Sequence, residues 1–178
     1  LVKVPDFKYS VGKIETIYLA TSIQPVANEI LPDKEMMRLP ERYLLFVGTR
    51  AGYKNFMGFL RAIAPVLNDD NSLSVVCAGG EYFSSEERRT FKALGVSGRI
   101  SQHSITSDAE MAILYQRAVA FIYPSLYEGF GFPVLEAFAC QCPVLASCSA
   151  SIPEVAGDAA IYINPSDLKS IKEAVVGV

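Results

Sequence analysis

The segment YEGFGFPVLEAFA, residues 127 to 139, holds the side chains best suited to chemistry in this sequence. Two glutamates, Glu128 and Glu136, flank a short turn that contains Gly129 and Gly131. Glycines permit a positive φ and a close approach of the main chain, so they leave backbone N–H groups pointing outward where a helix begins. We therefore predict an anion site at this turn, suited to a phosphate or to a polar sugar.

The two glutamates suit two different roles at such a site. Glu128 precedes the turn, where its carboxylate can accept hydrogen bonds from hydroxyl groups; a solvated loop residue is the alternative. Glu136 follows Pro133, a good first helical residue, and lies about one turn into the helix. A carboxylate there can hold a vicinal diol, such as that of a ribose, or simply favour the helix dipole. The glycines between the two glutamates favour the binding interpretation.

Apolar runs of strand length alternate with segments whose apolar residues recur at helical spacing, and these elements must position the motif. Strands are predicted at 13–20, 43–48, 73–79, near Arg99, 119–125, 143–147 and 159–163. Helices are predicted at 55–67, 84–95 and 107–118, after Pro133, in a short turn-helix at 150–157, and from Ser166 onward. Gly95 provides a C-terminal stop for the second helix, and Ser107 with Glu110 predicts a capping box for the third.

Strands that are apolar throughout and alternate with helices indicate a parallel sheet covered on both faces. The predicted fold class is therefore α/β, a doubly wound, Rossmann-like parallel sheet. Ligands of such sheets bind outside the carboxyl ends of the strands, and the strand 119–125 ends directly before the glycine turn. Residues 13–178 are expected to form the domain and residues 1–12 a linker remnant. Both ends look cut, so we expect a domain taken from a longer protein.

Composition and charge argue against several classes of protein. The 178 residues are 51% hydrophobic, which is typical of a globular domain. The net charge of −3 and the lack of a basic run argue against nucleic-acid binding. No apolar stretch reaches the length of a membrane span, and the first residues lack the pattern of a cleavable signal. The sequence thus predicts a soluble, cytoplasmic domain.

The cysteines and aspartates do not predict a metal site. Cys140 and Cys142 form a Cys-x-Cys pair, but with one histidine in the whole chain this is poor spacing for metal ligands. We expect all four cysteines to be buried free thiols, because free cysteine behaves as a small hydrophobe. Asp69 and Asp70 are adjacent, so they do not form an Asp-x-Asp pattern that could cradle a metal.

The segment YPSLYEGFGFPVLEAFACQCPVLASCSASIPEVAGDAAIYINPSD (123–167) resembles the donor-binding domain of the retaining group 1 glycosyltransferases, which have the GT-B fold. The similarity extends from about Lys13 to the end of the chain. It implies that Glu128 contacts hydroxyls of the donor sugar and takes part in catalysis, and that Glu136 binds the ribose of the nucleotide. It also implies that the amides of the turn meet the sugar and the diphosphate; these are the amides of Gly129, Phe130, Gly131 and Phe132.

The upstream segment FVGTRAGYKNF (46–56) resembles the strand-end turn of the same family, whose arginine and lysine neutralise the diphosphate. Lys54 is in register with the family's lysine. The family's arginine directly follows the first glycine, a position that Thr49 occupies here, so Arg50 is the expected substitute. Without the resemblance, solvated surface charges are an equally good interpretation of Lys54 and Arg50. The turn is not a Walker loop, because Gly48 lacks the spacing to a Gly-Lys-Ser/Thr triplet.

Other strand ends are expected at the edge of the nucleotide site. Gly48 and Thr49 end the strand 43–48, and Gly79 ends the strand 73–79, where it can admit the nucleotide or form a structural turn. The family's base pocket is formed partly by the loop after the short fourth strand, which here contains His103. A surface or internally paired histidine is the alternative.

The resemblance implies transfer of a hexosyl group from a UDP- or GDP-sugar to a glycan or lipid-linked acceptor, with retention at the anomeric carbon. No metal and no cofactor other than this nucleotide-sugar donor are expected, and no covalent nucleophile is assigned. The acceptor site is expected in an N-terminal domain outside this chain, so the fragment alone is expected to be inactive. We expect the full-length protein in the cytoplasm, and its peripheral association with the inner face of a membrane is left open.

Two other functions stay open on the sequence. A dinucleotide-binding oxidoreductase needs Gly-x-Gly-x-x-Gly after its first strand, whereas Gly129-x-Gly131 comes late and lacks the third glycine. A non-catalytic nucleotide-sugar binding module, or a GT-B nucleotide-sugar epimerase, would share the motifs named above. The resemblance also leaves the sugar, the base and the acceptor unspecified.

Overall fold

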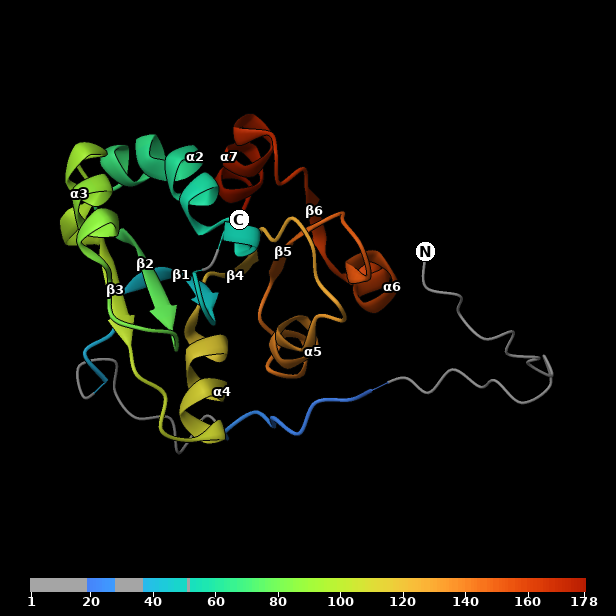
Figure 1. Cartoon of the computed structure of the whole chain (residues 1–178). Coiled ribbons are helices and arrows are strands. Elements are labelled where there is room, and N and C mark those ends of the chain that lie inside the picture. Colours follow the sequence, from blue (N-terminus) through green and yellow to red (C-terminus); the bar gives the residue numbers. More distant parts are fainter. Residues whose placement is uncertain (1–18, 28–36, 51) are drawn as a thin grey trace, which may run out of the picture.

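The computed structural model describes residues 19–27, 37–50 and 52–178, and this part of the chain contains one six-stranded sheet (Figure 1). The strands are β1 (Arg42–Val47), β2 (Leu73–Ala78), β3 (Ile100–His103), β4 (Ala120–Tyr123), β5 (Val144–Ser147) and β6 (Ile161–Ile163). Neighbouring strands are parallel, and their order is β3-β2-β1-β4-β5-β6. This is a doubly wound order with its switch point between β1 and β4. The predicted Rossmann-like α/β fold is confirmed.

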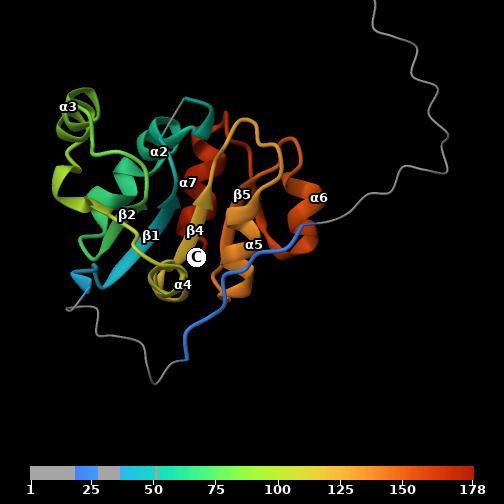
Figure 2. The ribbon, with the colours of Figure 1, turned by 60° about the horizontal axis from the view of Figure 1, so that its bottom comes forward.

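Helices cover both faces of this sheet. They are α2 (Phe56–Asp69), α3 (Ser85–Ala93), α4 (Asp108–Arg117), α5 (Phe132–Ala139), α6 (Ile152–Ala156) and α7 (Leu168–Val176). Short 3-10 turns are η3 (Gly52–Lys54), η4 (Ser97–Arg99) and η5 (Gly157–Ala159). Figures 1 and 2 show α2, α3 and α7 on one face of the sheet and α4 and α5 on the other.

Successive side chains of a strand enter two different hydrophobic cores, because the side-chain period of a strand is two. In β1, Leu44 and Phe46 belong to the core that includes Phe59 of α2. Leu45, which lies between them, belongs to the core that includes Leu114 of α4. Both sides of the central strand are therefore buried, which explains why the strands are apolar throughout rather than alternating.

The predicted elements from residue 43 onward are all present in the structure. Gly95 follows α3 with a φ of 75°, as expected of a glycine that stops a helix. The strand predicted at 13–20 lies mainly outside the described residues. Leu19 and Ala20, which are described, belong to no strand.

The capping box predicted at the start of α4 is only half formed. The Ser107 hydroxyl accepts a hydrogen bond from the N–H of Glu110 (3.2 Å). The Glu110 carboxylate, however, accepts from the N–H of Thr106 (2.7 Å) instead of from Ser107. A complete capping box forms at the start of α3, between Ser84 and Glu87, where the sequence analysis did not place one.

The expectation of four buried thiols is wrong for one cysteine. Cys77, Cys140 and Cys142 are buried, but Cys148 is exposed because it follows the end of β5. Burial raises the pKa of Cys77 to about 12, so this thiol stays protonated. Within the described residues, no helix is long and apolar enough to cross a membrane, and no cluster of His, Cys, Asp and Glu could hold a metal ion.

The carboxyl ends of the central strands meet at one edge of the sheet. The N–H of Gly48, after β1, donates to the carbonyl of Ala78 in β2 (2.9 Å). The N–H of Gly79, after β2, donates to the carbonyl of His103 in β3 (3.1 Å). These bonds fix the loops after β1, β2 and β3 beside one another. The glycine turn follows β4 at the same edge.

Candidate functional site

The glycine turn lies between β4 and α5 and depends on Gly131. This glycine is buried, precedes α5 and has a φ of 113°, a conformation that side chains disfavour. A Cβ atom added there would lie 2.8 Å from Cδ1 of Ile152 in α6. The prediction of a positive φ is thus confirmed for Gly131. It is wrong for Gly129, which is exposed and has an ordinary φ.

Two carbonyl groups at the turn have a hydrogen-bond partner, whereas its amides donate to none of the described residues. The Ser151 hydroxyl, before α6, lies 3.0 Å from the carbonyl oxygens of both Glu128 and Phe130 and donates to this pair. The N–H groups of residues 129 to 132 donate no hydrogen bond to any described residue. The rings of Phe130 and Phe132 pack with their centroids 4.9 Å apart. The turn therefore presents main-chain donors at the start of α5, where the helix dipole favours an anion.

Glu128 and Lys54, which are far apart in the sequence, form an ion pair beside this turn. Nζ of Lys54 lies 2.7 Å from Oε1 of Glu128, and the two side chains are only 13% and 12% exposed. The Lys54 ammonium also donates to the hydroxyl of Tyr123 (3.5 Å) and lies 5.0 Å from the centroid of its ring. The structure thus brings two of the predicted site residues together. Tyr123, at the end of β4, was not among the predicted residues.

Hydrogen bonds between loops hold this pair in place. The N–H of Leu126 donates to the carbonyl of Tyr53, which precedes Lys54 (2.8 Å). The Asn55 amide donates to the carbonyls of Pro124, after β4 (3.2 Å), and Pro165, before α7 (2.7 Å). Asn55 has a left-handed φ of 55° and does not cap α2 with its side chain. Its amide instead ties three segments of chain together around the Lys54 position.

The surroundings of Tyr123 keep its hydroxyl protonated. Burial raises the pKa of Tyr123, and the neighbouring Glu128 carboxylate, which interacts with it by charge and by hydrogen bonding, raises it further. A protonated phenol can donate to one group while it accepts from another. Tyr123 is therefore able to bridge the carboxylate of Glu128 and the ammonium of Lys54.

Glu136 lies in α5, half-buried against α4. Its Oε2 accepts a hydrogen bond from the hydroxyl of Tyr115 (2.9 Å). Burial raises the pKa of Glu136, the hydrogen bond from Tyr115 lowers it, and the charge of Asp108 raises it again, so the net direction is upward. Tyr115 was not predicted from the sequence. A buried tyrosine needs a partner for its hydroxyl, but the sequence pattern does not say which.

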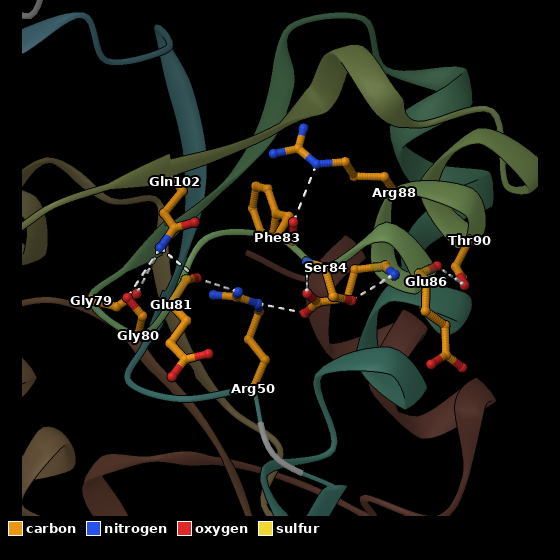
Figure 3. A network of polar contacts seen from close by, with 11 residues as sticks. Arg50, Gly79, Gly80, Glu81, Phe83, Ser84, Glu86, Arg88, Thr90 and Gln102 are labelled. Atoms are coloured by element: carbon orange, nitrogen blue, oxygen red, sulfur yellow. Dashed lines mark hydrogen bonds and ion pairs between the residues drawn. The ribbon is translucent and has the colours of Figure 1, made fainter.

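Arg50 lies in a different network from the Lys54–Glu128 pair (Figure 3). Its Nε is 2.6 Å from Oε1 of Glu87 at the start of α3, and these side chains are 6% and 15% exposed. Its Nη2 donates to the carbonyl of Glu81 (2.5 Å), and its guanidinium lies 4.6 Å from the ring centroid of Phe83. The structure thus pairs Arg50 with Glu87. Its role as the diphosphate cation stays a prediction.

Residues 28–176 match the family model of the group 1 glycosyl transferases.

The chain belongs to this family.

Among curated proteins, the O-antigen chain mannosyltransferase B of Escherichia coli is 31% identical over 176 residues, which is 96% of this chain and 46% of that protein. The chain thus spans about half the length of this relative.

Among solved structures, the C-terminal domain of the group 1 glycosyl transferase LpcC of Francisella tularensis has a TM-score of 0.74 at 21% identity, over 90% of this chain and 87% of that one. HepE of Anabaena, solved with UDP-glucose, has a TM-score of 0.73 at 13% identity, over 89% and 45%. At this identity the structures show a common fold, that of the C-terminal half of GT-B glycosyltransferases.

In this member of the group 1 glycosyl transferase family, the loop after β2 is held by its carbonyl groups. Gly79 and Gly80 both have a φ of 71°, and a Cβ at Gly80 would lie 2.8 Å from the carbonyl oxygen of Gly48. The amide of Gln102 in β3 donates to the carbonyls of Glu81 (2.6 Å) and Gly80 (3.2 Å), as Figure 3 shows. Gln102, like Tyr123 and Tyr115, was not predicted from the sequence.

Two cavities adjoin this loop. One of about 550 Å³ lies between α2 and the start of α3, and Thr49 and Arg50 are part of its wall. The other, of about 430 Å³, lies at the carboxyl ends of β2 and β3 and is lined by Gly80, Glu81, Tyr82, Gln102 and Ser104. Gly48 and Gly79, which are predicted to bind the nucleotide, do not line these cavities. Each is adjacent in sequence to a residue that does.

His103 of the glycosyltransferase domain is internally paired. Its Nε2 lies 2.9 Å from Oε1 of Glu110 in α4. Burial alone would raise the pKa of Glu110, but hydrogen bonds from Thr106 and the contact with His103 outweigh burial and lower it. This contact agrees with the alternative interpretation of His103, in which the side chain is paired inside the protein. Its place in a base pocket stays a prediction.

Proposed function

We propose that this domain binds the donor of a retaining glycosyltransferase, a UDP- or GDP-linked hexose, for transfer to a glycan or lipid-linked acceptor. The observation that carries the proposal is the Lys54–Glu128 pair beside free main-chain donors at the carboxyl edge of the sheet. The UDP-glucose in the HepE structure and the mannosyltransferase activity named for the Escherichia coli relative support a nucleotide-sugar donor.

Each part of the donor has a partner in this proposal. The diphosphate meets the amides of residues 129 to 132 and the Lys54 ammonium. The sugar hydroxyls donate to Glu128, and the ribose diol donates to Glu136. Cleavage of the sugar–phosphate bond builds negative charge on the leaving diphosphate, and fixed cations and N–H dipoles aimed at that charge stabilise the transition state. No side chain is assigned as a covalent nucleophile.

The acceptor is proposed to bind to a part of the longer protein outside this chain. The length of the Escherichia coli relative, of which the chain covers 46%, supports this proposal. The 178-residue chain is then expected to bind the donor weakly and to transfer nothing to a sugar acceptor. Measurable transfer of a sugar by the chain alone would contradict an acceptor site outside it.

Calorimetric titration of the chain with UDP, GDP and NAD tests the donor proposal. We expect one of the two nucleoside diphosphates to bind more tightly than NAD. Binding of NAD without either nucleoside diphosphate would instead indicate a hydride-transfer domain. In the longer protein, cleavage of a nucleotide sugar that is lost on Glu128→Ala would distinguish an enzyme from a binding module.

Glu136→Ala is expected to weaken binding of the nucleoside diphosphate by about 1–3 kcal/mol, the usual effect of leaving buried hydroxyl groups without partners. Calorimetry on the variant measures the change. Glu173→Ala is the matched control, because Glu173 lies exposed on α7, where it pairs with Lys169 at 3.6 Å. Equal affinities of the Glu136 variant and the unmodified chain would refute the ribose assignment.

A further inference from the structure

The two side chains proposed to bind the donor are already bound to each other. Lys54 and Glu128 are 2.7 Å apart and almost buried, so each neutralises the charge of the other. In the proposed function, however, they serve different parts of the ligand. Lys54 takes the diphosphate, whereas Glu128 takes the sugar. A ligand that draws Lys54 away therefore leaves Glu128 without its cation, in a place where solvent compensates poorly.

We propose that this ion pair makes the site select an intact nucleotide sugar over the bare nucleoside diphosphate. The inference rests on the proposed function. A nucleoside diphosphate offers an anion to Lys54 and nothing to Glu128, so part of its binding energy is lost in separating the pair. A nucleotide sugar brings hydroxyl donors to the carboxylate at the same time. Only the intact donor satisfies both members of the pair.

Tyr123 is the positioning residue of this arrangement. Its side chain is 2% exposed at the end of β4, and its own ring lies against that of Phe121 in the core, with centroids 5.5 Å apart. The hydroxyl and the ring face of Tyr123 both approach the Lys54 ammonium. A rigid side chain thus holds Lys54 at the distance where it meets Glu128. The loop bonds of Leu126 and Asn55 fix the backbone of both partners.

The same pair favours release of the product. Once the sugar has left, the remaining nucleoside diphosphate no longer matches Glu128. The ion pair between Lys54 and Glu128 then forms again only if the diphosphate dissociates. Selection of the substrate and release of the product are two results of one contact.

Glu128→Gln tests the proposal, because it keeps the size of the side chain and removes its charge. Binding of UDP, GDP, UDP-glucose and GDP-mannose to the chain is measured by calorimetry. We expect the affinity for the nucleoside diphosphate to rise about three- to tenfold, because Lys54 no longer has to be separated from a carboxylate. This increase lies between those expected from breaking an exposed and a buried ion pair. The preference for the matching nucleotide sugar is expected to fall by at least the same factor.

Glu173→Gln is the control, since it makes the same change in an ion pair on α7 whose side chains are 79% and 65% exposed. It should leave every affinity unchanged. Tyr123→Phe, which keeps the ring, is a second test and should lower the preference for the nucleotide sugar.

Three results distinguish the hypotheses. Nucleoside diphosphate affinity that is unchanged or weakened in Glu128→Gln would overturn the selection proposal and leave the proposed function standing. If Glu128→Gln does not fold, an unaltered preference in a folded Tyr123→Phe variant would overturn it as well. An unmodified chain that binds none of the four compounds would contradict the proposed function itself.

Discussion

Gly131→Ala is expected to destabilise the domain by about 2–4 kcal/mol, the sum of a strained backbone and an overpacked contact. The φ of 113° at this position disfavours any side chain, and the new methyl group would meet Cδ1 of Ile152 at 2.8 Å. Ile152 is fully buried, so it has little room to move. Urea unfolding at neutral pH, with the change read from the midpoint, measures the loss.

Gly129→Ala is the matched control for this variant. Gly129 has an ordinary φ, and a Cβ added there would meet no heavy atom within 4 Å. Its effect on stability is expected to stay within about 0.5 kcal/mol. Equal stabilities of the two variants would show that Gly131 does not determine the geometry of the turn.

Arg50→Ala is expected to destabilise the domain by about 3–5 kcal/mol, because it leaves the carboxylate of Glu87 without its cation in a nearly buried place. The variant also loses the hydrogen bond to the Glu81 carbonyl and the contact with the Phe83 ring. Arg42→Ala is the control, since Arg42 pairs with Asp70 at 2.8 Å in an exposed position. Exposed pairs contribute about 0–1 kcal/mol. Equal losses in the two arginine variants would contradict a special role for Arg50.

The effect of Arg50→Ala should depend on pH. Burial alone would raise the pKa of Glu87, but hydrogen bonds from Arg50 and Ser84 outweigh burial and lower it below the ordinary value of 4.5. A lowered pKa in the folded state stabilises the fold above the unfolded value, and this contribution disappears as the pH falls through the folded value. The difference in unfolding free energy between Arg50→Ala and the unmodified chain should therefore be full at pH 7 and shrink below pH 4.5.

The sequence predicted the sheet, and the edge at which the candidate site residues meet, because these depend on local patterns and on topology. Uninterrupted apolar strands such as the one around Leu44 and Leu45 indicate burial on both faces. Gly131 before Pro133 marks a turn that enters a helix. The topology rule for parallel sheets then places residues from different strand ends at one edge. Lys54 and Glu128 meet there, although 74 positions separate them in the chain.

Polar partners across elements were harder to predict. The sequence shows that Arg50 follows a strand, but α3 lies close enough for Glu87 to reach the guanidinium, and this depends on helix packing. Tyr115 likewise meets Glu136 only because α4 packs against α5. Glu110 accepts from Thr106 rather than from Ser107, a choice between adjacent donors that spacing alone does not decide. Periodicity predicts which face a residue occupies, and it does not predict its partner on that face.

The side-chain amide of Asn55 connects the candidate site to the segment that precedes α7. It donates to Pro165, three residues before α7 begins, and α7 in turn packs along α2, the helix that Asn55 precedes. Lys54 is the neighbour of Asn55. Displacement of α7 is therefore expected to shift Lys54, the cation of the proposed donor site, through both the Asn55 amide and the packing of α7 on α2.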